Sequence, residues 1–76
     1  MEDLNVRKFK ILAHGGSGAQ YPTLVANGEG NREACITQVK IVANTLGNGG
    51  IARAFLPLGI EPWAACRNEN GKLILI

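Results

Sequence analysis

The chain has few aromatic residues, a single histidine, no long hydrophobic run and no large excess of charge of either sign. Its 76 residues include two Phe, one Trp, one Tyr and one His, and the formal net charge is +2. Basic residues spread singly do not make the electrostatic footprint of a typical nucleic-acid-binding domain. Because no long apolar run is present, we expect neither a membrane-spanning segment nor a signal peptide. We therefore expect a cytoplasmic protein that does not associate with membranes.

Cysteine is also scarce. Cys35 and Cys66 are the only two, so they cannot build a disulfide framework or a four-ligand zinc site. Two reduced, buried thiols are the expectation, although a bridge from a helix to a strand is geometrically allowed. A domain of this size buries only about 60% of the surface that its unfolded chain exposes. Since neither disulfides nor a metal is expected, self-association is the expected source of additional stability.

The clearest positive signal is the helical period of residues 31–47. Its apolar residues fall on one side of such a helix: Cys35, Ile36, Val39, Val42, Ala43 and Leu46. This spacing is typical of an amphipathic helix that buries one stripe. Asn31 is a preferred N-cap residue, and the charge of Glu33 suits the positive end of the helix dipole. Gly47 can adopt the left-handed conformation that commonly ends a helix.

Two strands are expected before the helix. Residues 6–14 alternate between apolar and polar side chains, as in a half-buried strand. Residues 14–20 contain three glycines and must form a loop. Residues 21–27 are predicted as the second strand, and Pro22 places this strand at an edge or at a strand beginning. The first half of the chain is thus a β-hairpin that leads into the helix.

Three further strands are expected after the helix. Residues 51–58 alternate and are interpreted as a strand, although a short helix would also fit. Residues 63–76 give the clearest hairpin, because Asn70-Gly71 is the preferred central pair of a type I′ turn. That turn pairs Glu69 with Lys72.

Together these segments predict a small single α+β domain, an antiparallel sheet packed on one central helix in the order β-β-α-β-β-β. The domain covers residues 6–76, and residues 1–5 are predicted to be a flexible N-terminus.

The last hairpin is apolar on both faces. One face carries Ala64, Cys66, Leu73 and Leu75, and the other carries Trp63, Ala65, Arg67, Ile74 and Ile76. A sheet covered by a helix on one side should be polar on the other. We therefore predict a protein interface at Trp63, Arg67, Ile74 and Ile76. A shift of one residue would swap the faces and place Trp63 in the core instead.

No catalytic, cofactor or metal site is predicted. His14 could act as an acid, a base or a ligand, but no nucleophile or carboxylate stands at a useful spacing from it. The segment 15–18, Gly-Gly-Ser-Gly, could offer N–H groups to a phosphate. A phosphate loop, however, normally enters a helix and carries a lysine, whereas this one enters a strand and has none. A hairpin loop is the simpler interpretation.

The preferred hypothesis is a non-enzymatic interaction protein that self-associates, as a homodimer, or binds a protein partner through the C-terminal hairpin. Adaptors, toxin–antitoxin partners and the inhibitors that phages make against host defence systems are of this kind. The alternative is a small basic nucleic-acid-binding module. It would use Lys8, Lys10, Arg53 and Arg67 on an exposed sheet face, with Trp63 or Tyr21 stacking on a base.

Overall fold

The computed structural model describes residues 6–76, which form five strands and one helix. The predicted flexible terminus, residues 1–5, lies outside the described residues. In chain order the elements are β1 (Arg7–His14), β2 (Thr23–Gly30), α1 (Arg32–Leu46), β3 (Ile51–Phe55), β4 (Ala64–Glu69) and β5 (Lys72–Leu75). The order β-β-α-β-β-β confirms the predicted α+β fold.

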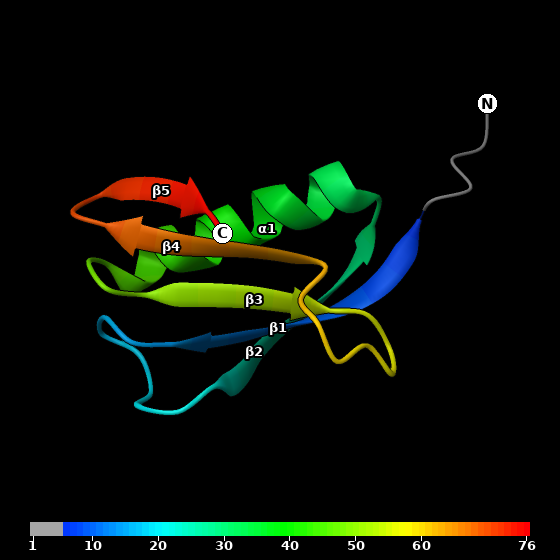
Figure 1. The fold of residues 1–76 in the computed structure, drawn as a ribbon, viewed down its shortest axis with the longest axis horizontal. Coiled ribbons are helices and arrows are strands. Elements are labelled where there is room, and N and C mark those ends of the chain that lie inside the picture. Colours follow the sequence, from blue (N-terminus) through cyan, green and yellow to red (C-terminus); the bar gives the residue numbers. More distant parts are fainter. Residues whose placement is uncertain (1–5) are drawn as a thin grey trace.

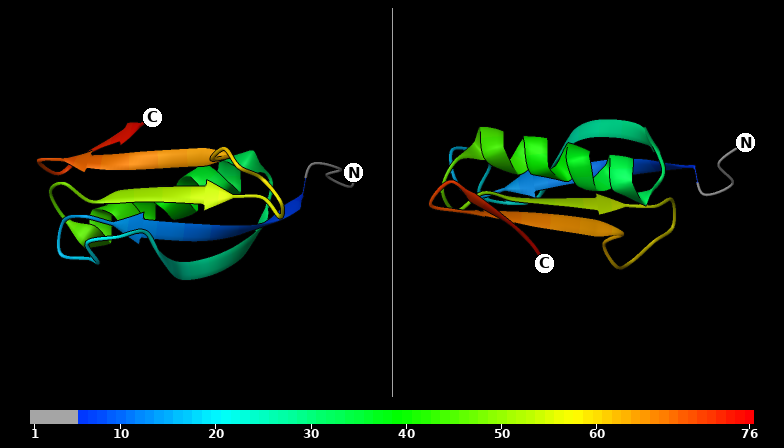
Figure 2. Two further views of the ribbon diagram at one scale, coloured as in Figure 1. Left: turned by 60° about the horizontal axis from the view of Figure 1, so that its bottom comes forward. Right: turned by 90° about the horizontal axis from the view of Figure 1, so that it is seen from above.

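The strands form one sheet in the spatial order β2-β1-β3-β4-β5, and every neighbouring pair is antiparallel. The helix α1 lies across one face of this sheet (Figures 1 and 2). Within residues 6–76, no helix or strand covers the opposite face (Figure 2). The face toward α1 is called the inner face below, and the opposite one the outer face. The two edge strands are β2 and β5.

The inner face is built mainly from small side chains. Its residues at the centre of the sheet are almost fully buried: Ala13, Ala52, Ala54, Ala64 and Cys66. From α1, the fully buried Cys35, Val39 and Ala43 pack against them, as the helical period predicts. Small side chains allow the helix to approach the sheet closely, and the larger Phe9 and Ile11 of β1 complete the core.

Both ends of α1 are capped by the residues that the sequence indicates. The Asn31 side-chain oxygen accepts a hydrogen bond of 2.9 Å from the Ala34 N–H, which satisfies one of the free donors of the first turn. At the other end Gly47 has a φ of 79° and a ψ of −168°, and its N–H donates to the Asn44 carbonyl. The positive φ favours glycine, but the ψ angle differs from that of the predicted left-handed cap. The prediction of a helix between these two residues is confirmed.

The C-terminal hairpin has the predicted register. Glu69 pairs with Lys72, and Arg67 pairs with Ile74. The φ angles of Asn70 and Gly71, 56° and 88°, are both positive, as a type I′ turn requires. The local sequence of the turn therefore sets the pairing of β4 with β5.

The predicted boundaries of two strands are wrong. The second strand begins at Thr23 and continues to Gly30, three residues beyond the predicted end. Its glycines are needed there, because a Cβ atom on Gly28 would lie 2.4 Å from the Phe9 ring. Residues 51–58 form a strand only as far as Phe55, since the segment that follows is a turn closed by a hydrogen bond from the Gly59 N–H to the Leu56 carbonyl.

The outer-face placement of Trp63 is also corrected. Trp63 lies just before β4, where its N–H donates to the Ala54 carbonyl at 2.7 Å. Its ring packs against the core, with its centroid 6.2 Å from that of Phe9. The alternation of side chains between the two faces begins only at Ala64, the first residue of β4. It therefore could not predict on which face Trp63 lies.

One polar side chain of the described residues is buried in the core. Asn68 of β4 is 2% exposed, and its side-chain NH₂ donates to the Ala43 carbonyl of α1 at 3.1 Å. Its side-chain oxygen accepts from the Gly71 N–H at 2.8 Å. This amide ties the hairpin turn to the last part of the helix.

Candidate interaction surface

The outer face is the candidate functional site, and strand alternation places its side chains. From β1, β3, β4 and β5 they are Lys8, Lys10, Leu12, His14, Ile51, Arg53, Phe55, Ala65, Arg67, Glu69, Lys72 and Ile74. From the edge strand β2 they are Leu24, Asn27 and Glu29. This face mixes large apolar side chains with an excess of cations.

Arg53 occupies the centre of the outer face. In register it lies between Leu12 of β1 and Ala65 of β4, and its neighbours along β3 on the same face are Ile51 and Phe55. Four apolar residues therefore border Arg53, which is itself partly buried.

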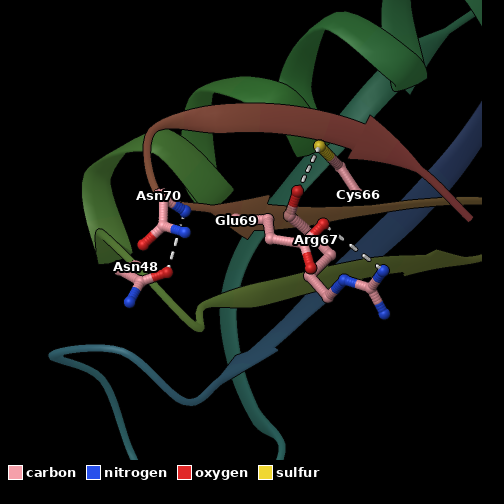
Figure 3. Close-up of polar contacts among 5 residues, drawn as sticks. All are labelled: Asn48, Cys66, Arg67, Glu69 and Asn70. Atoms are coloured by element: carbon pink, nitrogen blue, oxygen red, sulfur yellow. Dashed lines mark hydrogen bonds and ion pairs between the residues drawn. The ribbon is translucent and has the colours of Figure 1, made fainter.

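The only side-chain partner of Arg53 within residues 6–76 is the ring of His14. Its Nη1 lies 3.5 Å from Nδ1 of His14, which can accept only when the proton of the imidazole is on Nε2. The single ion pair of that part of the chain joins Arg67 to Glu69, at 3.8 Å between solvent-exposed groups (Figure 3). Such an exposed ion pair contributes little to stability. Arg53 has no carboxylate partner within residues 6–76.

Figure 3 shows how the end of the hairpin is held beside this surface. The Asn48 side-chain oxygen, from the turn after α1, accepts a hydrogen bond of 2.8 Å from the Asn70 N–H. The exposed side chains of Arg67 and Glu69 lie next to this contact on β4. The charged pair therefore stands on an anchored hairpin.

Three of the four predicted interface residues lie on or beside the outer face. Arg67 and Ile74 are paired directly across β4 and β5. The Ile76 N–H donates to the Ala65 carbonyl, which carries the pairing beyond β5 and leaves the Ile76 side chain 56% exposed. Trp63, the fourth, packs on the core.

The cations of the alternative site share this face. Lys8 and Lys10 project from β1, Arg53 from β3 and Arg67 from β4. The spatial order places β3 between β1 and β4, so four positive groups distant in sequence lie on one surface.

A hollow of about 450 Å³ opens beside these lysines. Its lining residues are Lys8, Phe9, Lys10, Asn27, Gly28, Glu29 and Pro57. The register places Lys8 opposite Glu29 and Lys10 opposite Asn27, and Pro57 closes the hollow from the loop that joins β3 to β4. This end of the outer face is therefore concave.

The same loop carries two exposed aliphatic residues that the sequence reasoning missed. Leu58 and Ile60 are 103% and 94% exposed, and Leu58 has a positive φ of 63°, which is rare for a side chain of this size. The loop bends to the side of the sheet away from α1 (Figure 2, right). Their exposure could have been predicted from their position between Pro57 and Pro62. These prolines favour a tight turn, and the side chains of such a turn do not reach the core.

The glycine-rich loop after His14 is tied to the helix. The N–H and the hydroxyl of Ser17 both donate to the Leu46 carbonyl, at 2.9 and 3.0 Å. A Cβ atom on Gly16 would lie 2.4 Å from that same carbonyl oxygen. The Gly15 and Gly18 N–H groups donate to loop carbonyls. Close packing explains the glycines, and these N–H groups are turned to protein rather than toward a phosphate.

Both cysteines are free and buried. Burial raises the pKa of the Cys35 and Cys66 thiols above the ordinary value of 9.0, so both are neutral thiols near pH 7.

Across residues 6–76, no group of three His, Cys, Asp or Glu side chains could hold a metal ion. The same residues include no helix long and apolar enough to cross a membrane.

The chain matches no known protein family, and neither a curated protein nor a solved structure resembles it. Its function is therefore inferred from its own residues.

Proposed function

We propose that this protein is a small, non-enzymatic interaction protein, of the adaptor or inhibitor type, that docks another protein on the outer face of its sheet. The partner presents apolar side chains together with carboxylates. The proposal is based mainly on the environment of Arg53. It is partly buried among four apolar neighbours and has no carboxylate partner among residues 6–76.

The environment of Arg53 favours an added counter-charge. Partial removal of water from a charged group is unfavourable unless an opposite charge compensates for it. A guanidinium group can bind a carboxylate through two parallel hydrogen bonds, and arginine is enriched among the residues that dominate interface energies. A partner carboxylate placed over Arg53 would provide that compensation.

The apolar side chains around Arg53 support a protein partner. An antiparallel sheet with one solvated face normally carries polar residues there, yet Leu12, Ile51, Phe55 and Ile74 lie on this one. Each stays partly exposed. Their burial against a partner would supply the hydrophobic contribution that a charged contact alone lacks.

The charge of the outer face favours a different, acidic molecule over a second copy stacked face to face. Five cations and two carboxylates lie on it: Lys8, Lys10, Arg53, Arg67 and Lys72 against Glu29 and Glu69. Stacking two such faces would bring like charges together, which weakens association. An acidic partner would instead be attracted over a distance.

Nucleic-acid binding remains the second candidate, supported by the four cations Lys8, Lys10, Arg53 and Arg67. Single-stranded nucleic acid usually also requires aromatic rings on which bases stack. Phe55 is the aromatic residue that the strands place on this face, and Trp63 is packed against Phe9. Aliphatic side chains outnumber rings, which favours a protein partner.

The proposal is tested by selecting ligands without a known partner. A displayed library of random peptides and a pool of random single-stranded nucleic acids are selected in parallel against the immobilised protein. We expect peptides that combine Asp or Glu with aliphatic residues, and we expect Arg53→Glu to weaken their binding about 30-fold or more, as for a residue worth about 2 kcal/mol.

The matched control is Ile41→Ser, which removes an exposed aliphatic side chain from the helix on the far side of the sheet. It should leave peptide binding unchanged. Peptides that bind wild type and Arg53→Glu equally would refute the proposal. Selection of nucleic acid alone, with an affinity that falls steeply as salt rises, would establish the second candidate instead.

A further inference from the structure

The loop between β3 and β4 and the hollow beside it are complementary in polarity and charge. We propose that two copies of this chain form a dimer in which each copy inserts Leu58 and Ile60 into the hollow lined by Lys8 and Lys10 of the other. This contact lies at one end of the outer face and does not use Arg53, the residue on which the proposed partner binding depends.

The loop presents its aliphatic residues in a fixed conformation. The hydrogen bond from the Gly59 N–H to the Leu56 carbonyl, 2.9 Å long, closes a turn around Leu58, and prolines stand at 57 and 62. A loop restrained in this way loses little conformational freedom when it binds. Two almost fully exposed aliphatic side chains on a restrained turn are typical of a binding element rather than of a solvated loop.

The hollow has the size and the wall for such an element. Its volume of about 450 Å³ lies in the range of about 300 to 1,000 Å³ found for ligand pockets. The wall is mainly carbon, as when lysine side chains lay their methylene groups along a surface and extend the ammonium groups outward. Apolar side chains that enter the hollow can contact this carbon wall.

The charges of the loop and the hollow are opposite. Lys8 and Lys10 line the hollow together with Glu29, which leaves one net positive charge. Glu61 follows Ile60 in the loop, is exposed, and forms no ion pair within residues 6–76. With Ile60 in the hollow of a second copy, Glu61 would stand over the lysines of that copy. A second copy therefore matches the hollow in charge as well as in polarity.

The position of the loop also permits a closed dimer. Pro57 lines the hollow and Leu58 follows it directly, so the two complementary surfaces are neighbours on one molecule. A two-fold axis between them would bring each loop to the other copy's hollow and use both contacts at once. The association then ends at two copies.

The first test is the mass in solution, measured by light scattering from micromolar to millimolar concentration. We expect wild type to reach twice the chain mass of 8.1 kDa, and a Leu58→Ser/Ile60→Ser variant to need at least ten times the concentration. Both residues are exposed, so circular dichroism should show an unchanged helix. Ile41→Ser, an exposed aliphatic change on α1, should dimerise as wild type does. A monomeric wild type throughout this range, or a serine variant that dimerises normally, would overturn the proposal.

The second test reverses the charges. Glu61→Lys alone places cation against cation, and Lys8→Glu/Lys10→Glu alone places carboxylate against carboxylate, so each variant should be monomeric at concentrations at which wild type dimerises. Mixed in equal amounts, the two should form a dimer, because each loop then meets a hollow of opposite charge. Absence of association in the mixture would refute this arrangement, whatever peptide selection shows for the centre of the outer face.

Discussion

On β3, Ala52 and Ala54 face α1 and are fully buried, whereas Ile51, Arg53 and Phe55 face away from it and stay partly exposed. On this strand the small side chains lie where the helix covers the sheet, and the larger ones lie where no helix or strand of residues 6–76 covers it. The neighbouring β1 differs, because its inner face carries the large Phe9 and Ile11.

This contrast separates the residues that fold the chain from the residues that are free to bind. Small side chains on the inner face allow the helix to pack closely against the sheet, so folding determines the size of the residues there. Ile51, Phe55 and Ile74 lie outside that core. Apolar side chains that folding does not bury are available for association.

The largest expected effect comes from removing a large side chain from the inner face. Ile11→Ala should lower the free energy of unfolding by about 2–5 kcal/mol, because Ile11 is 1% exposed and its loss leaves a cavity. Leu12→Ala, one residue along on the outer face, should cost less than half as much. Urea unfolding followed by circular dichroism measures both, and equal losses would remove the distinction between the faces.

A smaller effect is expected from filling the inner face. Ala54→Leu adds volume between the sheet and α1, and should lower the free energy of unfolding by about 1–3 kcal/mol. Arg53→Leu, the adjacent position on the outer face, should leave stability unchanged or raise it slightly. The same urea titration tests the pair. A tolerated leucine at position 54 would show that the helix does not need a surface of small residues.

A comparable effect is expected at the buried amide of Asn68. Asn68→Ala removes the bonds to the Ala43 carbonyl and the Gly71 N–H, and should lower the free energy of unfolding by about 1–3 kcal/mol. Asn27→Ala, an exposed amide on β2, is the control and should change stability by no more than about 0.5 kcal/mol. Thermal unfolding followed by circular dichroism distinguishes the two, and an unaffected Asn68→Ala variant would show that this amide does not hold the hairpin to the helix.

The smallest effect is a pH dependence from the two cysteines. Burial raises the pKa of Cys35 and Cys66 above 9.0 in the folded protein. Above about pH 9 the unfolded state therefore releases protons that the folded state keeps, and stability falls as pH rises. Below that value both states hold the proton and the thiols contribute no pH dependence.

Urea titrations between pH 7 and pH 10.5 should show this decline, and a Cys35→Ala/Cys66→Ala variant should show a smaller slope. An equal slope in both proteins would assign the pH dependence to other groups.

Local signals in the sequence predicted much of the fold. The helical period with Asn31 and Gly47 gave the helix, and Asn70-Gly71 gave the last hairpin and its register, because each depends on residues close in the chain. The extension of β2 to Gly30 was not predictable in this way, because glycine disfavours strands. Gly28 is explained only by its close approach to the Phe9 ring of β1, and Gly30 by its approach to Ala34 of α1.

The candidate site was predicted in part for a related reason. Arg67, Ile74 and Ile76 follow from the alternation of one hairpin, which local sequence determines. Trp63 precedes the strand, so alternation does not apply to it. The central position of Arg53 depends on the spatial order of β1, β3 and β4. The pairing of β1 with β3 brings together Leu12 and Arg53, which are far apart in the sequence.

The outer face as a docking surface is tested most directly by nuclear magnetic resonance of the 15N-labelled protein, titrated with a selected acidic peptide. The account predicts shifts of backbone amides on β1, β3 and β4 around Leu12, Arg53 and Ala65, with those of α1 unchanged and with the response lost in Arg53→Glu. Shifts that gather on α1, or that persist in Arg53→Glu, would contradict it.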